Sequence, residues 1–331
     1  MCVLSPTRDS PLVRSHGPPV KGEAVDAESD GVMSVNSASR ALTTSEPLQP
    51  QDLVITLLGT YIRPRGGTVW SGGLVQLLGE FGFTQGAARA ALTRLVRRGL
   101  LSRVRQGRLI HYRVTERADR LLAEGDRRIY SFGQPRTDGN QWTILWHRIP
   151  EDRRLEWARL ARRLRFLGFG PLQDGLWVSP HDHVNDVTQL LGELEVAEHA
   201  TVLVARTATP EGLPGLVGNT WDLSGLADRY GAFLAEFSPY LNRRERARLS
   251  DKEAFLVRTQ LIHHFRGFPW LDPELVEELA PLGESRARAV ATFQHVFTAL
   301  TQPAEEHFWT VAAGFAAGGG PSSRGGGRRH A

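Results

Sequence analysis

The stretch that decides the fold covers residues 84–114 and reads TQGAARAALTRLVRRGLLSRVRQGRLIHYRV. Its first half predicts a helix that Thr84 caps and that ends at about residue 98, because Gly99 follows. Apolar residues spaced three and four positions apart would face the core, and these are Ala88, Ala91, Leu92 and Leu95. The second half alternates as two strands, at 100–104 and 109–114, which a Gln-Gly turn joins into a hairpin.

Two more helices precede this stretch. Apolar residues follow a mixed helical spacing over 51–62, before Pro64 ends the pattern. A turn at 63–67 leads to residues 70–81, where Leu74, Leu77, Leu78 and Phe81 repeat with helical spacing. Three helices followed by a hairpin predict a winged helix, which a connector helix over 116–130 extends to residue 133.

The rest of the chain predicts two further domains. Between 140 and 208, helices and short strands alternate in the order β-α-β-β-α-β, which is typical of a ferredoxin-like domain. From 218 to 315 the periodicity is helical, with interruptions at prolines. Residues 135–140 read as a linker, and the polar segment 1–50 and the glycine-rich segment 316–331 read as disordered tails. We therefore predict an α+β chain with a winged helix-turn-helix, a ferredoxin-like domain and an all-helical domain.

Composition narrows the class of protein. No apolar run approaches the roughly 20 residues that span a bilayer, and the start of the chain carries prolines and charges where a secretory signal needs an apolar stretch. We expect a soluble, cytoplasmic protein that does not bind a membrane. The single cysteine, Cys2, excludes an internal disulfide framework and a cysteine-based zinc site. Met33 is an alternative natural start, a hypothesis that a peptide from residues 1–32 in native cells would contradict.

Positive charge is concentrated in the winged helix. Residues 51–133 hold 14 Arg against 6 Asp plus Glu, a surplus of 8, whereas the net charge of the whole chain is +4, so the remainder carries −4. A general preference for Arg over Lys explains the number of arginines but not this asymmetry. A basic module attached to a mildly acidic body indicates a polyanionic partner.

Between residues 84 and 113 there are eight arginines and no acidic residue. Gln85, Arg89 and Thr93 share one face of the third helix, opposite its apolar face, where a recognition helix presents side chains to the major groove. Because Arg pairs with guanine and Gln with adenine, we predict that these three residues read bases. Residues predicted to contact the DNA backbone, mostly at the end of this helix and on the wing, are Arg65, Arg94, Arg97, Arg98, Arg103, Arg105, Arg108 and His111.

Two alternatives remain for this surface. It can be a solvated basic face without a partner, or a winged helix that mediates protein contacts. The fold context and the absence of acidic residues favour double-stranded DNA.

Three segments carry a family resemblance. YIRPRGGTVWSGGLVQLLGEFGFTQGAARAALTRLVRRGLL resembles the N-terminal signature of the PaaX-type repressors of phenylacetic acid catabolism. FLGFGPLQDGLWVSP is similar to the family's middle domain, and FRGFPWLDPELVEELAP to its C-terminal helical region. The resemblance implies a homodimer that represses transcription from a palindromic operator. We expect such a protein to be associated with the nucleoid. It also implies release by an aryl-coenzyme A thioester such as phenylacetyl-coenzyme A.

The resemblance raises two rivals. The middle domain is similar to the CRISPR-associated spacer-integration nuclease subunit, which needs a carboxylate on its first strand to hold a metal. Here the strand over 142–147 offers no Asp or Glu, so we do not expect a nuclease. The sequence also has no glycine-rich phosphate loop, no GxSxG motif and no zinc-type His/Glu motif, so we expect no other enzyme and no cofactor. A regulator without a small-molecule effector remains open as the other alternative.

If an acyl-coenzyme A binds, cationic side chains would meet its phosphates and aromatic ones its acyl group. Candidates by residue type are Arg162, Arg163, Trp221, Arg258, His263 and Arg266, with Phe265 and Trp270 as further aromatic residues. Adjacent His263 and His264 point about 100° apart on a helix and do not share one ligand. The alternative to a metal site or an acid/base pair at these histidines is a capped core helix with one histidine on the surface.

Overall fold

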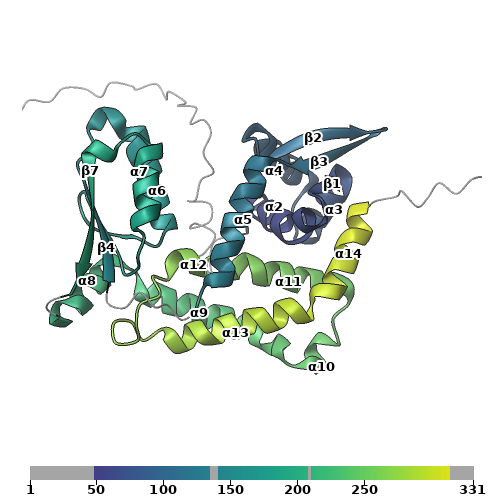
Figure 1. Ribbon diagram of the computed structural model, residues 1–331. Coiled ribbons are helices and arrows are strands. Elements are labelled where there is room, and N and C mark those ends of the chain that lie inside the picture. The colour runs from purple at the N-terminus through teal and green to yellow at the C-terminus, as the bar shows by residue number, and fades with distance from the viewer. Residues whose placement is uncertain (1–47, 135–140, 208–209, 314–331) are drawn as a thin grey trace, which may run out of the picture. The chain divides into compact units, whose positions relative to one another are not determined.

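The computed structural model describes residues 48–134, 141–207 and 210–313. The predicted linker over 135–140 lies outside these ranges, and so do the two predicted tails except for residues 48–50. Within them, no helix is both long enough and apolar enough to span a membrane. The fold class is confirmed, since helices and two sheets alternate as predicted (Figure 1).

The N-terminal module is a three-stranded winged helix. Its elements are α2 (Pro50–Leu57), η1 (Leu58–Ile62), η2 (Arg63–Arg65), β1 (Thr68–Trp70), α3 (Ser71–Glu80), α4 (Gln85–Arg97), β2 (Leu101–Gln106) and β3 (Leu109–Val114). The strand order is β1-β3-β2, and both pairings are antiparallel. The prediction that Trp70 begins a helix is wrong. Trp70 ends β1, where three residues with high strand propensity, Thr-Val-Trp, pair with β3 and bury Val69.

Helix α4 forms as its sequence predicts. The Thr84 hydroxyl accepts a hydrogen bond from the Ala87 amide at 3.2 Å, and Gly99 follows the helix with a φ of 66°, a left-handed conformation that favours glycine. The four predicted inward residues, Ala88, Ala91, Leu92 and Leu95, are buried. The opposite side of α4 is therefore free to face solvent or a ligand.

Helix α5 (Glu116–Ser131) follows the wing, and Thr115 caps it. Arg63 holds α5 against the winged helix, because its guanidinium makes ion pairs with Asp119 at 2.7 Å and Asp126 at 2.5 Å.

The middle region is ferredoxin-like. Its elements are β4 (Gln141–His147), η3 (Glu151–Arg153), α6 (Arg154–Phe166), β5 (Gly170–Gln173), β6 (Leu176–Ser179), α7 (Val184–Glu193), η4 (Ala197–His199) and β7 (Ala200–Arg206). The antiparallel sheet has the order β5-β6-β4-β7, and α6 and α7 pack on one of its faces through Leu145, Leu160 and Val187 (Figure 1). Asp174 and Gly175 form the turn between β5 and β6, as predicted.

The C-terminal region is helical. Its elements are η5 (Pro210–Gly212), α8 (Leu213–Thr220), α9 (Leu223–Phe237), η6 (Ser238–Leu241), α10 (Arg243–Arg246), α11 (Asp251–Phe265), α12 (Phe268–Leu271), α13 (Gly283–Ala299) and α14 (Thr301–Ala313). A core rich in phenylalanine joins α9, α11 and α13, and in it Phe265 stacks on Phe293 with ring centroids 3.9 Å apart.

Two of these C-terminal helices complete the core of the winged helix. Phe255 of α11 and Phe308 of α14 are buried in the same cluster as the apolar residues of α2, α3 and α4. Phe308 stacks on Tyr61 with ring centroids 4.6 Å apart and an interplanar angle of 9°. Figure 1 shows α14 beside α3, and Gly73 permits this approach, because a Cβ at that position would lie 2.7 Å from the Cα of Ala312. The local periodicity of the sequence does not show this long-range packing.

Candidate nucleic-acid interface

The outward face of α4 brings together the three residues predicted to read bases. Gln85 and Arg89 are exposed and Thr93 is half-buried. Arg89 donates to the Gln85 side-chain oxygen at 3.4 Å, and the Thr93 hydroxyl donates to the Arg89 carbonyl at 2.9 Å. Arg103 of the wing donates to the Thr93 hydroxyl at 3.5 Å, so helix and wing meet at this face. The two contacts made by the Arg89 and Arg103 guanidinium groups are long, at 3.4 and 3.5 Å, and exposed.

Arginines surround this face on the helix and on the wing. We name the set the α4–wing surface: Gln85, Arg89, Thr93, Arg94, Arg97, Arg98, Arg103, Arg105, Arg108 and Arg113. Arg98 is half-buried at the end of α4, whereas the other arginines of the set are exposed. Figure 1 shows the β2–β3 hairpin extending beyond α4. Arg105 lies near the end of β2, and Arg108 lies in the turn between the two strands.

Ion pairs between described residues do not neutralise the charge of this surface, although the charge of Arg98 acts on the carboxyl of Asp52, where it opposes the rise in pKa that burial causes. Within the described ranges, none of its eight arginines makes an ion pair with a carboxylate, although arginines elsewhere do, such as Arg63 with Asp119 and Arg286 with Asp272. Uncompensated guanidinium groups on a convex helix and hairpin can meet phosphates, and Arg can also pair with a guanine edge.

The tip of the wing adds an apolar feature that sequence reasoning missed. Leu109 is 46% exposed and Ile110 is 49% exposed, directly after Arg108. Gly107 makes the turn with a φ of 60°. Such side chains can pack against sugar rings while the neighbouring arginine contacts a phosphate. In the sequence, this feature is indicated by the apolar pair Leu-Ile directly after the Gly-Arg turn.

Two residues predicted to contact the DNA backbone lie in different surroundings. His111 is on the central strand, paired with Trp70 on one side and Val104 on the other, and is half-buried. Arg65 makes an ion pair with Glu305 at 2.9 Å, and its guanidinium lies 5.4 Å from the ring centroid of Trp309. Both partners are on α14, so Arg65 contributes to the contact with that helix and we leave it out of the α4–wing surface.

The six residues proposed for an effector do not form one site. Arg163 of α6 makes an ion pair with Glu124 of α5, and Arg162 is half-buried beside it. Trp221 packs elsewhere, with its ring centroid 6.3 Å from that of Trp142. The two other suggested aromatic residues, Phe265 in the C-terminal core and Trp270 beside Phe166, are also apart.

The remaining three candidates lie where α11 meets the first helix of the winged helix. We name this the α2–α11 contact and define it by Asp52, Thr56, Tyr61, Arg258, Thr259, His263 and Arg266. The Tyr61 and Thr259 hydroxyls are 3.1 Å apart, and Nδ1 of His263 is 3.2 Å from the Thr56 hydroxyl. The Arg258 guanidinium lies 4.1 Å from the ring centroid of Phe297 and is buried. These side chains hold two parts of the chain together rather than line a ligand pocket.

Burial sets the charge states in this contact. Burial lowers the pKa of His263 well below its usual value, and the charges of Arg266 and His264 lower it further. Burial also raises the pKa of Asp52, against the opposing charge of Arg266. His263 is buried, His264 is partly exposed, and a Ser250 capping box begins α11. The capped core helix with one surface histidine is therefore confirmed.

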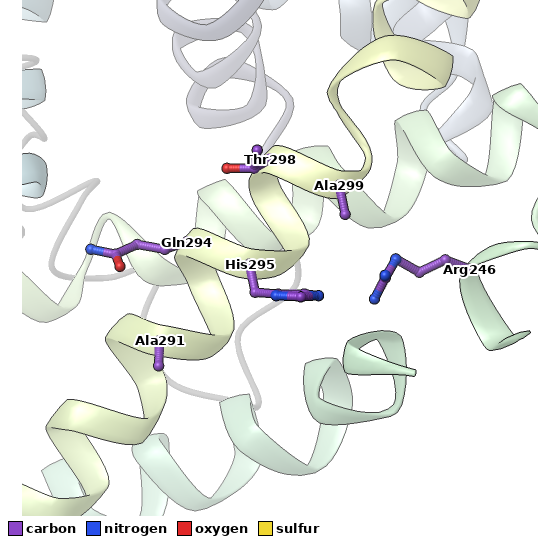
Figure 2. A pocket seen from close by; sticks show the side chains of 6 residues that line it. All are labelled: Arg246, Ala291, Gln294, His295, Thr298 and Ala299. Atoms are coloured by element: carbon purple, nitrogen blue, oxygen red, sulfur yellow. The ribbon is translucent and has the colours of Figure 1, made fainter. Parts of the chain in front are cut away.

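A pocket of about 540 Å³ opens between α10 and α13. It is lined by Arg246, Ala291, Gln294, His295, Thr298 and Ala299. Figure 2 shows His295 and Arg246 pointing toward one another across it. Arg246 also donates to the carbonyls of Tyr240 at 2.6 Å and Leu241 at 2.8 Å, which fixes its position. Sequence analysis selected none of these residues, because a pocket formed by separate helices leaves no local pattern.

The first strand of the middle domain offers no carboxylate, as the sequence predicted. Strand β4 reads QWTILWH and carries no Asp or Glu. In the part of the chain that the structure describes, no group of three or more His, Cys, Asp or Glu is arranged to hold a metal ion.

Comparison with known proteins gives consistent matches along the chain. Residues 49–118 match the family described as PaaX-like protein, 135–217 the PaaX protein central Cas2-like domain, and 221–310 the PaaX-like protein C-terminal domain. The chain is 32% identical to the transcriptional repressor PaaX of Escherichia coli (strain K12) over 240 residues, which are 71% of this chain and 75% of that protein. A solved structure, the uncharacterized protein Rv0674 from Mycobacterium tuberculosis, is similar with a TM-score of 0.49 and 25% identity, over 78% of this chain and 99% of that one.

Proposed function

Because the chain belongs to the PaaX family of transcriptional regulators, we propose that it is a DNA-binding repressor of genes for phenylacetic acid catabolism. The α4–wing surface would hold the operator, and an aryl-coenzyme A thioester would release it. The observation that carries the proposal is the set of eight arginines without carboxylate partners on a recognition helix and wing. The protein would act in the cytoplasm, at the nucleoid.

The surface suggests a division of labour in DNA binding. Gln85 and Arg89 are exposed on the face of α4 that a major groove would accept, so we assign sequence reading to them. The arginines at the end of α4 and on the wing would contact phosphates and fix the register. Leu109 and Ile110 would pack on the sugars beside the wing.

We further propose a homodimer on a palindromic operator. A two-fold protein places its two recognition helices about 34 Å apart, or a multiple of that distance, which matches one turn of DNA. Half-sites with this spacing are the expected footprint.

The effector part of the proposal needs a site, and the α10–α13 pocket is the candidate that we favour. It is open to solvent, and its guanidinium and imidazole can meet the phosphates of an acyl-coenzyme A. A regulator that answers to no small molecule is the alternative. The similarity to a repressor and the absence of a carboxylate on β4 point to a protein without catalytic activity.

Fluorescence anisotropy tests the proposal. The purified protein is titrated onto the DNA upstream of its own gene and onto random DNA of equal length, at two salt concentrations, with and without phenylacetyl-coenzyme A. We expect tight, salt-sensitive binding that exceeds binding to random DNA and is lost with the thioester. Free coenzyme A is the control for the shared nucleotide part.

The outcomes separate the parts of the proposal. Specific binding that the thioester leaves unchanged retains the repressor and contradicts this effector. A raised melting temperature with another acyl-coenzyme A would identify a different one, since a ligand of the folded state stabilises it. No preference over random DNA, on this and on the neighbouring intergenic fragments, would contradict the repressor and favour a protein-binding winged helix.

A further inference from the structure

Helix α5 carries a row of arginines on the face that points away from the winged helix. Arg120 and Arg127 are seven residues apart and both are exposed, so they share this face. The acidic residues Asp119 and Asp126 lie on another face, where Arg63 engages both. The exposed face carries Arg120 and Arg127, with Glu124 between them and Glu116 one turn before Arg120.

The row begins at the end of the recognition helix. Nη1 of Arg117, on the first turn of α5, donates to the carbonyl of Arg98, the residue that ends α4, at 3.3 Å. Helix α5 has 16 residues and so extends about 24 Å from this point. Along B-DNA, about 24 Å corresponds to roughly seven base pairs. Arg120 and Arg127 themselves lie about 10 Å apart along this axis, so the α5 row matches about three base pairs beyond the end of α4.

Helix α6 adds two arginines to this row. Arg163 makes an ion pair with Glu124, which lies between Arg120 and Arg127 on α5. Leu160 and Leu164 of α6 pack on the sheet of the middle domain, so the neighbouring Arg159 and Arg162 lie on the outer side of the helix. Within the described residues, Arg120, Arg127, Arg159 and Arg162 make no ion pair with a carboxylate, whereas Glu124 is already paired.

We propose that these four arginines form a flanking surface, defined by Arg120, Arg127, Arg159 and Arg162, which binds the phosphates of double-stranded DNA beside the segment that α4 reads. This inference rests on the proposed function. Charge complementarity carries it: none of the four guanidinium groups makes an ion pair with a carboxylate in the described residues, α5 begins beside the end of the recognition helix, and phosphate contacts need no base sequence. The long, flexible arginine side chains would reach the duplex without a groove.

The test compares duplex lengths. Footprinting of the upstream DNA first defines the shortest duplex that the wild-type protein binds specifically, and the same site is then extended by 10 bp of random sequence on each side. A variant with Arg→Gln at Arg120, Arg127, Arg159 and Arg162 removes the charge with a residue that favours helices. Of the four, Arg120, Arg127 and Arg159 are exposed and Arg162 is half-buried. The matched control replaces four exposed arginines elsewhere by Gln: Arg206, Arg243, Arg244 and Arg288. Circular dichroism checks that both variants fold.

On the long duplex, we expect the flanking variant to bind at least about tenfold more weakly at 0.1 M salt, with a slope of log K against log salt lower by up to about 3.6, or roughly 0.9 per lost phosphate contact. On the shortest duplex its affinity should approach that of wild type, and the control should match wild type on both. The inference is overturned if the extension does not strengthen wild-type binding. It is also overturned if the control loses as much affinity as the flanking variant, or if the flanking variant loses acyl-coenzyme A binding while DNA binding is unchanged. Absence of specific binding by wild type would instead contradict the proposed function.

Discussion

The α4–wing surface and the α2–α11 contact both depend on charged side chains, but their surroundings differ in kind. On the first, arginines are exposed and have no acidic partner, so their charge acts on whatever approaches from solvent. In the second, Arg258 and His263 are buried among aromatic rings and hydroxyls. Their interactions therefore affect the stability of the packing of α11 on α2. Exposure and partners, rather than residue type, distinguish a surface for binding from a contact for stability.

The largest expected effect concerns contacts that contribute to stability rather than to binding. Phe308→Ala should destabilise the protein by about 3–5 kcal/mol, because it leaves a cavity in a core that α14 shares with the winged helix. Chemical denaturation measures the loss, and hydrogen exchange locates it. Amides of α4 should exchange faster in this variant.

Phe233→Ala is the matched control, since Phe233 is equally buried but belongs to the core of α9, α11 and α13. It should destabilise the protein without a selective effect on α4. If both variants speed exchange in α4 equally, the C-terminal helices do not support the winged helix in the way that the shared core implies.

On the binding side, Arg89→Ala should have the largest effect. Loss of a bidentate pair with a base costs about 1–3 kcal/mol, so affinity for the operator should fall about 5- to 150-fold while binding to random DNA changes little. Arg108→Ala, on the wing, should weaken both DNAs by a similar factor and lower the salt slope by about 0.9. Anisotropy on the two DNAs gives both ratios. Identical scaling of specific and random DNA by the two variants would contradict the assignment of base reading to α4.

The pH dependence of stability is a smaller effect and belongs to the α2–α11 contact. The pKa of folded His263 is lowered by burial, whereas the unfolded chain has the usual value of about 6.5, so the folded state binds fewer protons. The neutral His263 side chain therefore stabilises the fold fully above about pH 6.5. As the pH falls below this value, the free energy of unfolding decreases by up to about 1.4 kcal/mol per pH unit. Denaturation of His263→Gln between pH 7 and pH 5 should show a flatter profile than wild type.

Part of this dependence should remain in the variant. Burial also lowers the pKa of His147 in the middle domain, and that group acts in the same direction. His264→Gln is the control, because His264 is partly exposed. A wild-type slope in His263→Gln would show that His263 takes up its proton without disturbing the contact.

Local patterns predicted the elements but not the contacts between distant segments. The cap at Thr84 and the buried face of α4 followed from spacing alone, and so did the order of strands and helices in the middle domain. Strand β1 was missed because three residues are too few to show alternation beside a strong helical pattern. The predicted base-reading and backbone contacts themselves remain predictions.

The role of an individual arginine depends on contacts with distant residues, which the sequence does not reveal. Arg65, Arg163 and Arg258 look alike in the sequence. In the structure, Arg65 makes an ion pair with a residue of α14 and Arg163 with a residue of α5, whereas Arg258 is buried over an aromatic ring. Their partners lie between 39 and 240 residues away, so no local signal could identify them. The α10–α13 pocket escaped prediction for the same reason.

The smallest expected effect tests whether Arg65 contributes to packing against α14 rather than to DNA binding. Arg65→Gln removes an ion pair whose partners are partly exposed, so stability should fall by no more than about 1 kcal/mol. Since Arg65 is engaged with Glu305 and Trp309, DNA affinity and its salt slope should stay at wild-type values. Glu305→Gln should give the same small loss of stability, and the double variant should lose less than the sum of the two. A salt slope reduced by about 0.9 in Arg65→Gln would instead return Arg65 to the DNA-binding surface.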